Sequence, residues 1–301
     1  MSISQPGLRR LLLGGLGVAA LAACGNQGRS PSVGDGERNV SQTTTDHAAI
    51  RQLFEEAAAC GDRYRCPPQD ELLARAEGPE GTPVAEVALE LMADPGVRSF
   101  DRLGKAAFEV ARNWAAARVR AGTFDAGARS MLLEGVRRVL ADDSSTFVVA
   151  VYSLFSGPIG DAIPEAKEIL TAEALNPKRD LSQMDDAVKV LQRFTPGLGQ
   201  IRPWLESGDE RRQLAALSLL DYADHTGFSA AEEQALLEAA ARRPNLPQSV
   251  AIALVGHVQG HEDEAFLPVL VPLERHGDAE LREAATEAAA AIRQAEAARG
   301  P

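Results

Sequence analysis

Two histidines, His257 and His261, have the residue type and spacing that most invite a chemical interpretation. Four residues apart, they would share one face of a helix, and the acidic residues at 262–264 could complete a metal site. However, Gly256 and Gly260 flank the pair, which predicts that the helix ends there and that the acidic residues open the next one. The HExxH arrangement of zinc peptidases is absent. The sequence therefore favours a solvated loop between helices and predicts no metal site.

Other patterns that carry chemistry are missing. The chain lacks the Gly-x-Ser-x-Gly and Ser-x-x-Lys patterns of hydrolases, the Gly-x-x-x-x-Gly-Lys phosphate loop and the Cys-x-x-Cys-His haem motif. We therefore predict no catalytic residue and no cofactor, and we favour a non-enzymatic function. An active site assembled only by the fold stays open.

The first 23 residues have the layout of an export signal. Arg9 and Arg10 supply positive charge, residues 11–23 are apolar or small, and the run ends in Leu21-Ala22-Ala23-Cys24. The apolar run is too short to span a bilayer, which takes about 20 residues. This segment resembles the lipobox of bacterial lipoproteins, in which the cysteine thiol receives a diacylglycerol and the signal is cleaved before it. The resemblance implies lipidation of Cys24 and anchoring to a membrane.

The resemblance also implies an address. A bacterial lipoprotein of this kind lies in the cell envelope and faces the periplasm. Gly25, and not Asp, follows the anchor, which favours the outer membrane in a Gram-negative cell. The alternative is an ordinary secretory signal whose small residues happen to precede a cysteine.

The two remaining cysteines, Cys60 and Cys66, would lie in an exported chain, where disulfides persist. A bond between them would close a short loop and stabilise the fold by about 2 kcal/mol in the chain-entropy model. A redox pair is disfavoured because the spacing is not Cys-x-x-Cys. Half of a metal site is disfavoured because no further ligands are near. We expect a structural disulfide.

Composition limits the class of partner. The formal net charge is −12, which argues against nucleic acid, because its binding depends on neutralising phosphates. Solubility is a sufficient explanation of the acidic surface. Residues 24–46 are rich in Gly, Ser, Thr and Asn and lack apolar periodicity. Such a segment cannot bury enough apolar surface to offset its ordering entropy, so we predict a flexible tether.

From Asp46 onward the pattern is helical, and alternating strand patterns are absent. Breaks rich in Gly, Pro, Asp and Asn separate the segments, and Thr82 is expected to cap one of them. The predicted helices cover residues 47–59, 70–76, 83–92, 100–121, the stretch around 131–140, 145–155, 164–170, 181–194, 201–205, 209–224, 230–242, 248–259, 262–275 and 278–297.

Two stretches share a pattern of Asp at a helix start, Arg soon after, and then small apolar residues. They are Gly208–Leu217 and Gly277–Ala285. This pattern resembles the second helix of HEAT-type repeats, which implies an all-α solenoid of antiparallel helix pairs. The resemblance covers residues 205–298 well and the earlier part poorly, so a compact irregular helical bundle is the alternative. HEAT-repeat hydroxylases carry several His-Glu pairs, but this chain has only His261-Glu262, so their di-iron chemistry is not expected.

We therefore expect a signal peptide over residues 1–23, a lipidated N-terminus and tether over 24–46, and a helical-repeat domain over 47–298. Stacked helix pairs offer an extended surface for proteins. The predicted function is a membrane-tethered scaffold or assembly factor with a protein partner and a membrane partner through the lipid on Cys24. The alternative is an exported enzyme or metal-binding protein.

Overall fold

All the regular secondary structure of the described chain is helical. The computed structural model describes residues 36–60, 66–194, 198–222 and 228–299, and in these ranges it has fifteen α-helices, three short 3₁₀-helices and no strand. The prediction of an all-α fold is confirmed. The expected signal and Cys24 lie outside the described residues. No helix in the described ranges combines the length and the apolar character needed to cross a bilayer.

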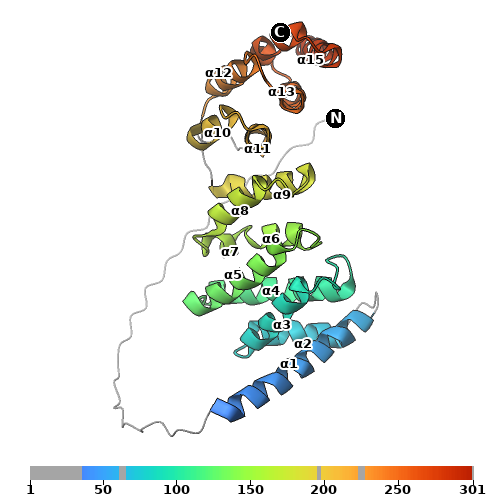
Figure 1. Cartoon of the computed structure of the whole chain (residues 1–301), viewed down its shortest axis with the longest axis vertical. Coiled ribbons are helices and arrows are strands. Elements are labelled where there is room, and N and C mark those ends of the chain that lie inside the picture. The colour runs from blue at the N-terminus through green and yellow to red at the C-terminus, as the bar shows by residue number, and fades with distance from the viewer. Residues whose placement is uncertain (1–35, 61–65, 195–197, 223–227, 300–301) are drawn as a thin grey trace, which may run out of the picture. The chain divides into compact units, whose positions relative to one another are not determined.

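The helices follow one another through short connections (Figure 1). Three of the connections, after α9, α13 and α14, contain 3₁₀ turns. The elements are α1 (Gly36–Ala59), α2 (Pro67–Glu77), α3 (Gly81–Ala93), α4 (Arg102–Arg120), α5 (Ala126–Ala141), α6 (Val148–Leu154), α7 (Pro158–Asp161), α8 (Ala166–Ala174), α9 (Leu181–Leu191), η1 (Gln192–Phe194), α10 (Leu198–Leu205), α11 (Glu210–Tyr222), α12 (Ala230–Ala241), α13 (Gln248–His261), η2 (Glu264–Phe266), α14 (Leu267–Leu270), η3 (Leu273–Arg275) and α15 (Ala279–Arg299).

The first helix begins earlier than the sequence predicted. Contacts divide the chain into units 1–42 and 43–301, and α1 runs across this boundary. Residues 36–46 were expected to be part of a flexible tether, but they form the first turns of α1. Residues 24–35 lie outside the described ranges. Ile50, Phe54 and Ala57 are buried and hold the later turns of α1 in place. Once those turns exist, extending the helix toward its N-terminus needs no new nucleus.

Proline explains most of the other boundary differences. Helix α2 begins at Pro67, and not at Asp70, because a proline in the first turn lacks only an N–H that would be unpaired anyway. Thr82 is not a cap, because α3 already begins at Gly81. The single helix expected over 262–275 is instead η2, α14 and η3. Pro268 and Pro272 fall inside that stretch, where each removes a main-chain donor.

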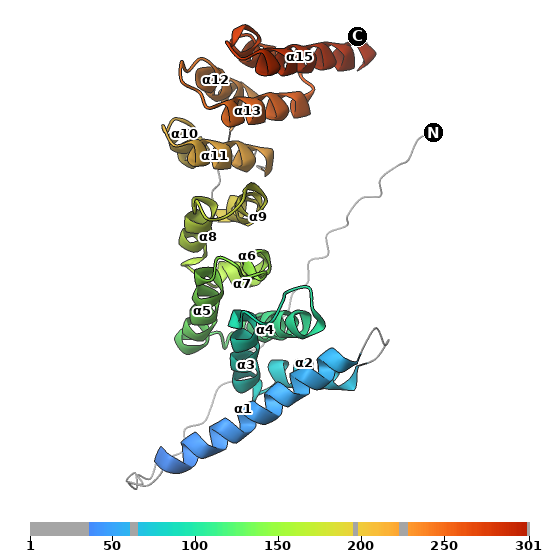
Figure 2. The same cartoon turned by 45° about the vertical axis from the view of Figure 1, so that its right-hand side comes forward.

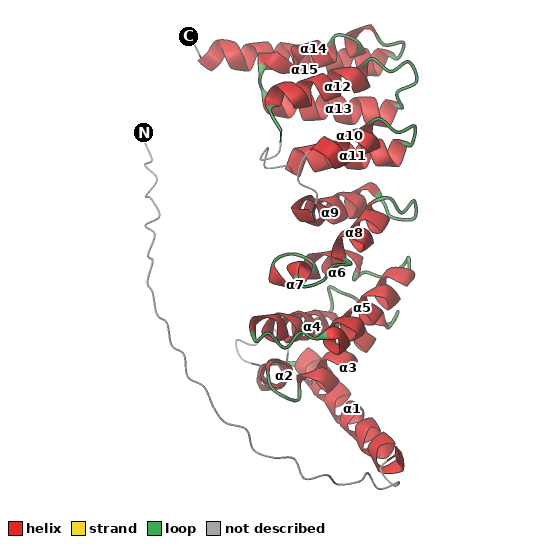
Figure 3. Cartoon of the chain, turned by 90° about the vertical axis from the view of Figure 1, so that its left-hand side faces the viewer, coloured by secondary structure: helices red, strands yellow, loops and turns green. Residues whose placement is uncertain are grey.

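Within the unit 43–301, helices pack on their neighbours along the chain and on the next helix but one. Helix α8 contacts α9, and α10 contacts α11. In addition, α9 contacts α11, α11 contacts α13 and α13 contacts α15, while α10 contacts α12 and α12 contacts α14. Figures 2 and 3 show these later helices in the order of the chain. Buried apolar side chains, mostly Ala, Leu and Val, from all the α-helices form one apolar cluster.

Three arginines make the same kind of bond between successive parts of this unit. Each follows or opens a helix and donates to a main-chain carbonyl at the end of an earlier helix, where carbonyls have no intrahelical partner, and two of them also donate to a carbonyl in the connection after that helix. The three arginines are evenly spaced along the chain. The bonds run from Arg179 to Leu140 (2.7 Å), from Arg211 to Ala174 and Arg179 (both 2.8 Å), and from Arg243 to Leu205 (2.9 Å) and Ser207 (3.1 Å).

Candidate functional site

Three side chains that can bind a metal converge where α12 meets α13. Glu233 lies in the first turn of α12, which Ser229 and Glu232 fix by a reciprocal capping box. His257 and His261 lie on α13, and their spacing of four residues places them on the same face. In the described part of the chain, this is the one group of three His, Cys, Asp or Glu side chains whose ligand atoms meet in this way.

The three ligand atoms form a small triangle. Glu233 Oε1 lies 2.9 Å from His257 Nε2 and 3.2 Å from His261 Nε2. The two Nε2 atoms are 3.2 Å from one another. The Glu233 and His257 side chains are only 1% and 3% exposed, whereas that of His261 is 20% exposed. The triangle is therefore buried on the side of α12 and reaches solvent beside His261.

Two further residues hold the imidazole rings from behind. The carboxylate of Asp221, on α11, bonds Nδ1 of His257, the nitrogen that points away from the triangle. The ring of Phe266, in η2, stacks on the ring of His261 with centroids 4.1 Å apart and planes 12° apart. Both Nε2 atoms are thus directed at Glu233 by contacts that lie outside the triangle.

The charges of the cluster depend on each other. Burial alone would lower the pKa of His257, but its hydrogen bonds to Asp221 and Glu233 raise that pKa to about 9. Burial would raise the pKa of Glu233, but hydrogen bonds to His257 and His261 lower it to about 2. With no other ligand present, the cluster is an imidazolium held between two carboxylates.

The same atoms have a second possible chemistry. Imidazole nitrogens and carboxylate oxygens are the ligands of Zn²⁺ and related transition metals, which bind the deprotonated forms. The bond from Asp221 keeps a proton on Nδ1 of His257, so that the Nε2 lone pair becomes the one available to an ion. The cluster can therefore hold a proton or a metal in the same place.

The sequence-based interpretation of this region was wrong in one respect. His257 and His261 do not lie in a solvated loop, because α13 continues through Gly256 and Gly260 to His261. Two glycines cost about 1 kcal/mol each in a helix, and the buried face that includes Val250, Leu254 and Val258 outweighs this cost. The acidic residues do follow the end of the helix, as expected, beginning with Glu262 in a left-handed conformation at φ 50°.

The sequence analysis also missed three residues of the cluster, namely Glu233, Asp221 and Phe266. Glu233 had a usable signal, because it shares a helical face with Leu236, Leu237 and Ala240, all buried. A glutamate on an apolar helical face predicts a charged partner or a bound metal, since buried charges are paired or bind metals. Asp221 and Phe266 had no such signal, because only the packing of α11 and η2 brings them to the histidines.

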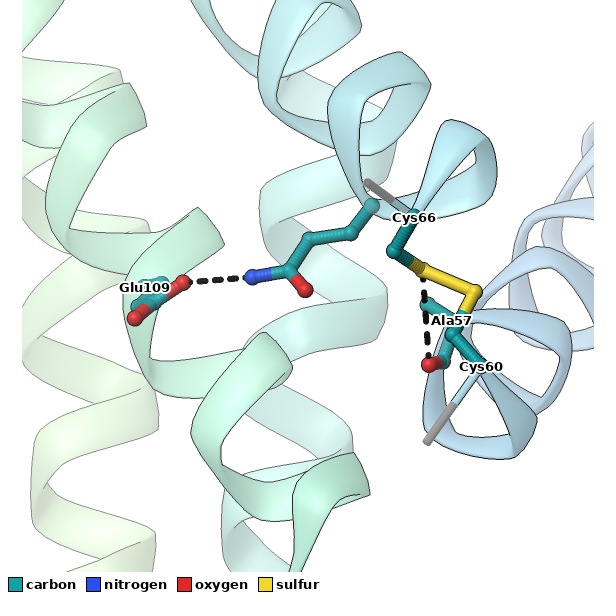
Figure 4. Close-up of a disulfide and its surroundings, with 5 residues drawn as sticks. Ala57, Cys60, Cys66 and Glu109 are labelled. Carbon is teal, nitrogen blue, oxygen red and sulfur yellow. Dashed lines mark hydrogen bonds between the residues drawn. A yellow bond between two sulfur atoms is a disulfide. The ribbon is translucent and has the colours of Figure 1, made fainter. Parts of the chain in front are cut away.

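The two internal cysteines lie where a disulfide was expected. Cys60 follows α1 and Cys66 directly precedes α2, and their Cα atoms are 5.7 Å apart (Figure 4). The prediction of this pair at bonding distance is confirmed. The Cys66 sulfur also lies 3.6 Å from the carbonyl oxygen of Ala57. One turn into α2, Gln69 donates to Glu109 of α4 at 2.7 Å, so that the segment after the disulfide is held to the next layer.

A second buried charge cluster lies around Arg179, between α8 and α9. Arg179 is 2% exposed, and its guanidinium donates from Nε to Glu173 at 2.7 Å and from Nη2 to the Leu140 carbonyl at 2.7 Å. The hydroxyl of Tyr152 donates to the same carboxylate at 2.9 Å. Burial alone would lower the pKa of Arg179, but the hydrogen bond and charge of Glu173 raise it. The remaining nitrogen, Nη1, lies 3.8 Å from Asp143 Oδ1 and makes no hydrogen bond in the described part of the chain, so Nε and Nη2 hold the guanidinium in place.

Comparison of the chain with protein-family models, curated proteins and solved structures finds no match. No family membership follows for this chain. Its function is therefore inferred from the residues, their geometry and the order of the segments along the chain.

Proposed function

We propose that the protein is a lipid-anchored scaffold or assembly factor of the bacterial cell envelope, built as a HEAT-like α-solenoid. In this proposal Cys24 carries the lipid, the globular part faces the periplasm, and the outer membrane is the anchor site if the cell is Gram-negative. The protein partner binds along the stacked helices.

The observation that carries the proposal is the recurrence of contacts within the unit 43–301. Helices contact the next helix but one in two series, α9 to α15 and α10 to α14. Evenly spaced arginines, Arg179, Arg211 and Arg243, bond carbonyls of the preceding part of the chain in the same manner each time. Repeat proteins are stabilised by such contacts between neighbouring units. Both features support a solenoid over an irregular bundle.

The anchor is tested by Cys24→Ser. The expected result is loss of fatty-acid labelling and release of the protein from the membrane fraction. Serine keeps the size of the side chain and removes only the thiol. Substitutions in the apolar run would disturb export as well, so Cys24→Ser is the matched change. A wild-type protein that is soluble and carries no acyl chain would overturn the assignment.

The scaffold function is tested by site-specific photocrosslinking in intact cells. Leu181 of α9 and Ile252 of α13 are large apolar residues with exposed side chains on helices of one contact series. A photoreactive residue at either position should give a discrete adduct with one protein. Ala239 of α12, also exposed, is the control on the other series. No adduct at Leu181 or Ile252, or the same adducts at Ala239, would count against a scaffold.

The second candidate is an exported metal-binding protein or enzyme. The convergence of Glu233, His257 and His261 favours it, because such a site is assembled only by the fold. The two candidates give different results in the same experiment. A scaffold gives the crosslinks at Leu181 and Ile252, and they persist in Glu233→Gln. A metal-binding protein or enzyme without a protein partner gives no such crosslinks in the wild type or in the variant.

A further inference from the structure

We propose that Glu233, His257 and His261 form a binding site for one transition-metal ion of the Zn²⁺ class. The inference is independent of the scaffold function and stands if the protein has no partner. It rests on the positions of three ligand atoms, on the contacts that orient them, and on the chemistry of the donor set.

The size of the triangle fits an ion. Zinc–nitrogen and zinc–oxygen bonds of about 2.0–2.1 Å place two ligands of a tetrahedral site about 3.3–3.4 Å apart. The three separations in the cluster are 2.9, 3.2 and 3.2 Å. Each ligand atom would have to move by only a few tenths of an ångström to accept the ion. The ion would lie just outside the plane of the triangle.

The orientation of the rings also fits an ion. The two Nε2 atoms face each other and the same carboxylate oxygen, so that one cation placed among them would be bound by all three. Asp221 bonds the far nitrogen of His257, which is the arrangement that fixes metal-binding histidines in proteins. Phe266 fixes the ring of His261 by stacking. The ligands are therefore held in place before an ion arrives.

The donor set selects the class of ion. Two imidazoles and one carboxylate suit Zn²⁺ and its neighbours in the first transition row, whereas Ca²⁺ and Mg²⁺ prefer oxygen ligands alone. Three protein ligands leave the fourth tetrahedral position for water. The partly exposed side of the cluster, beside His261, is where solvent can reach that position. A bound ion would join α12 to α13 across their contact.

The test is a titration of the full-length chain, purified in detergent and stripped with a chelator, with Zn²⁺ alone. One equivalent should bind. Glu233→Gln and His261→Ala should each weaken binding by more than the roughly 10- to 100-fold that loss of a partner behind a metal ligand costs. Asp221→Asn should fall within that range, because Asp221 orients His257 without touching the ion.

His47→Ala is the matched control. His47 Nε2 lies 3.3 Å from Glu86, so it is also a histidine beside a carboxylate, but no third ligand joins the pair from the described residues. This variant should bind one equivalent of Zn²⁺ as tightly as the wild type. Circular dichroism checks that each variant keeps the helical content of the parent chain.

A measurement on the wild type keeps the test independent of folding in the variants. X-ray absorption of the Zn²⁺-loaded protein should show two imidazole ligands, with nitrogen and oxygen scatterers only. The inference is overturned if no Zn²⁺ binds at micromolar concentration or if absorption shows fewer than two imidazoles. It is also overturned if folded Glu233→Gln binds as tightly as the wild type.

Discussion

The clusters around Arg179 and His257 are both buried and charged, but they differ in what they can exchange. Around Arg179, a guanidinium that is always protonated donates to Glu173 and to the Leu140 carbonyl. Around His257, the atoms that face one another are two imidazole nitrogens and a carboxylate oxygen, each of which can offer a lone pair. The first cluster has one possible state, whereas the second can hold either a proton or a metal ion.

This difference separates structural charges from candidate functional ones. Arg179 and Arg211 join consecutive parts of the helical unit through main-chain carbonyls, so their role is to connect elements. Glu233, His257 and His261 bond one another through their side chains, and contacts from outside the triangle orient the two imidazole rings. Burial of a charge is therefore a weak guide to function, and convergence of lone pairs is a better one.

The largest expected effect comes from breaking the Arg179 cluster. Arg179→Met leaves the carboxylate of Glu173, 8% exposed, without its cation. Removing one partner of a buried pair costs about 3–5 kcal/mol of unfolding free energy. Urea denaturation followed by circular dichroism measures this loss, and Zn²⁺ should not restore it.

Lys178→Met is the control for that change. Lys178 pairs with Asp143 at 2.7 Å, but its side chain is 66% exposed, so the substitution should change the unfolding free energy by less than about 1 kcal/mol. Equal stability of the two variants would show that the Arg179 cluster is not a structural element.

The next effect is stabilisation of the His257 cluster by metal. Zn²⁺ at 100 times its dissociation constant should raise the unfolding free energy of the wild type by about 2.7 kcal/mol. Arg179→Met should gain the same amount, since the two clusters share no residue, and Glu233→Gln should gain none. A gain in Glu233→Gln as large as that of the wild type would remove the distinction between the clusters.

A smaller effect is the pH dependence of the metal-free protein. The pKa of His257 is raised from 6.5 to about 9, so its contribution to stability is complete below pH 6.5 and is lost as the pH rises through 9. The loss should exceed about 1.4 kcal/mol, the equivalent of one pKa unit. With Zn²⁺ bound this loss should disappear, because the ion binds deprotonated ligands and the folded and unfolded states then carry equal numbers of protons above about pH 6.5. Urea denaturation at pH 6.5 and at pH 9, once with chelator and once with Zn²⁺, measures how the unfolding free energy changes with pH in each case. The same change with chelator and with Zn²⁺ would contradict the proposal.

The smallest effects concern the capping boxes beside the two clusters. Asp180 caps α9 by accepting from Gln183 at 2.7 Å, and Ser229 caps α12 in the same way. Asp180→Ala and Ser229→Ala should each cost about 1 kcal/mol of unfolding free energy. Only Ser229→Ala should weaken Zn²⁺ binding, and by less than about tenfold, since 1.4 kcal/mol corresponds to a factor of ten. Calorimetric titration of both variants shows whether the position of Glu233 depends on its cap.

Sequence periodicity was sufficient to predict a helix and its boundaries where the segment's own residues decide its structure. The helix expected over 230–242 is α12 with its start at Ala230, because Ser229 and Glu232 supply the cap and the buried leucines follow at helical spacing. The pairing of Cys60 with Cys66 was also predictable, since the two are close in the chain. The prediction was wrong for residues 36–46 and for 262–275, where the neighbouring helix or internal prolines set the boundary.

The candidate site, by contrast, could not be predicted from the sequence. His257 and His261 were visible as a pair in the sequence, but two glycines indicated a loop, and only tertiary packing makes the extended helix stable. Glu233 lies well away from them along the chain, and nothing local indicates that α12 brings its carboxylate to their Nε2 atoms.

The sequence by itself determined that the chain is helical, where most helices begin and end, and which cysteines can pair. These properties depend on interactions between residues close in the chain. The tertiary structure alone decided which charges are buried together, because that depends on contacts between α11, α12, α13 and η2, whose residues no local rule places side by side. The part of this protein most able to do chemistry is therefore a product of packing.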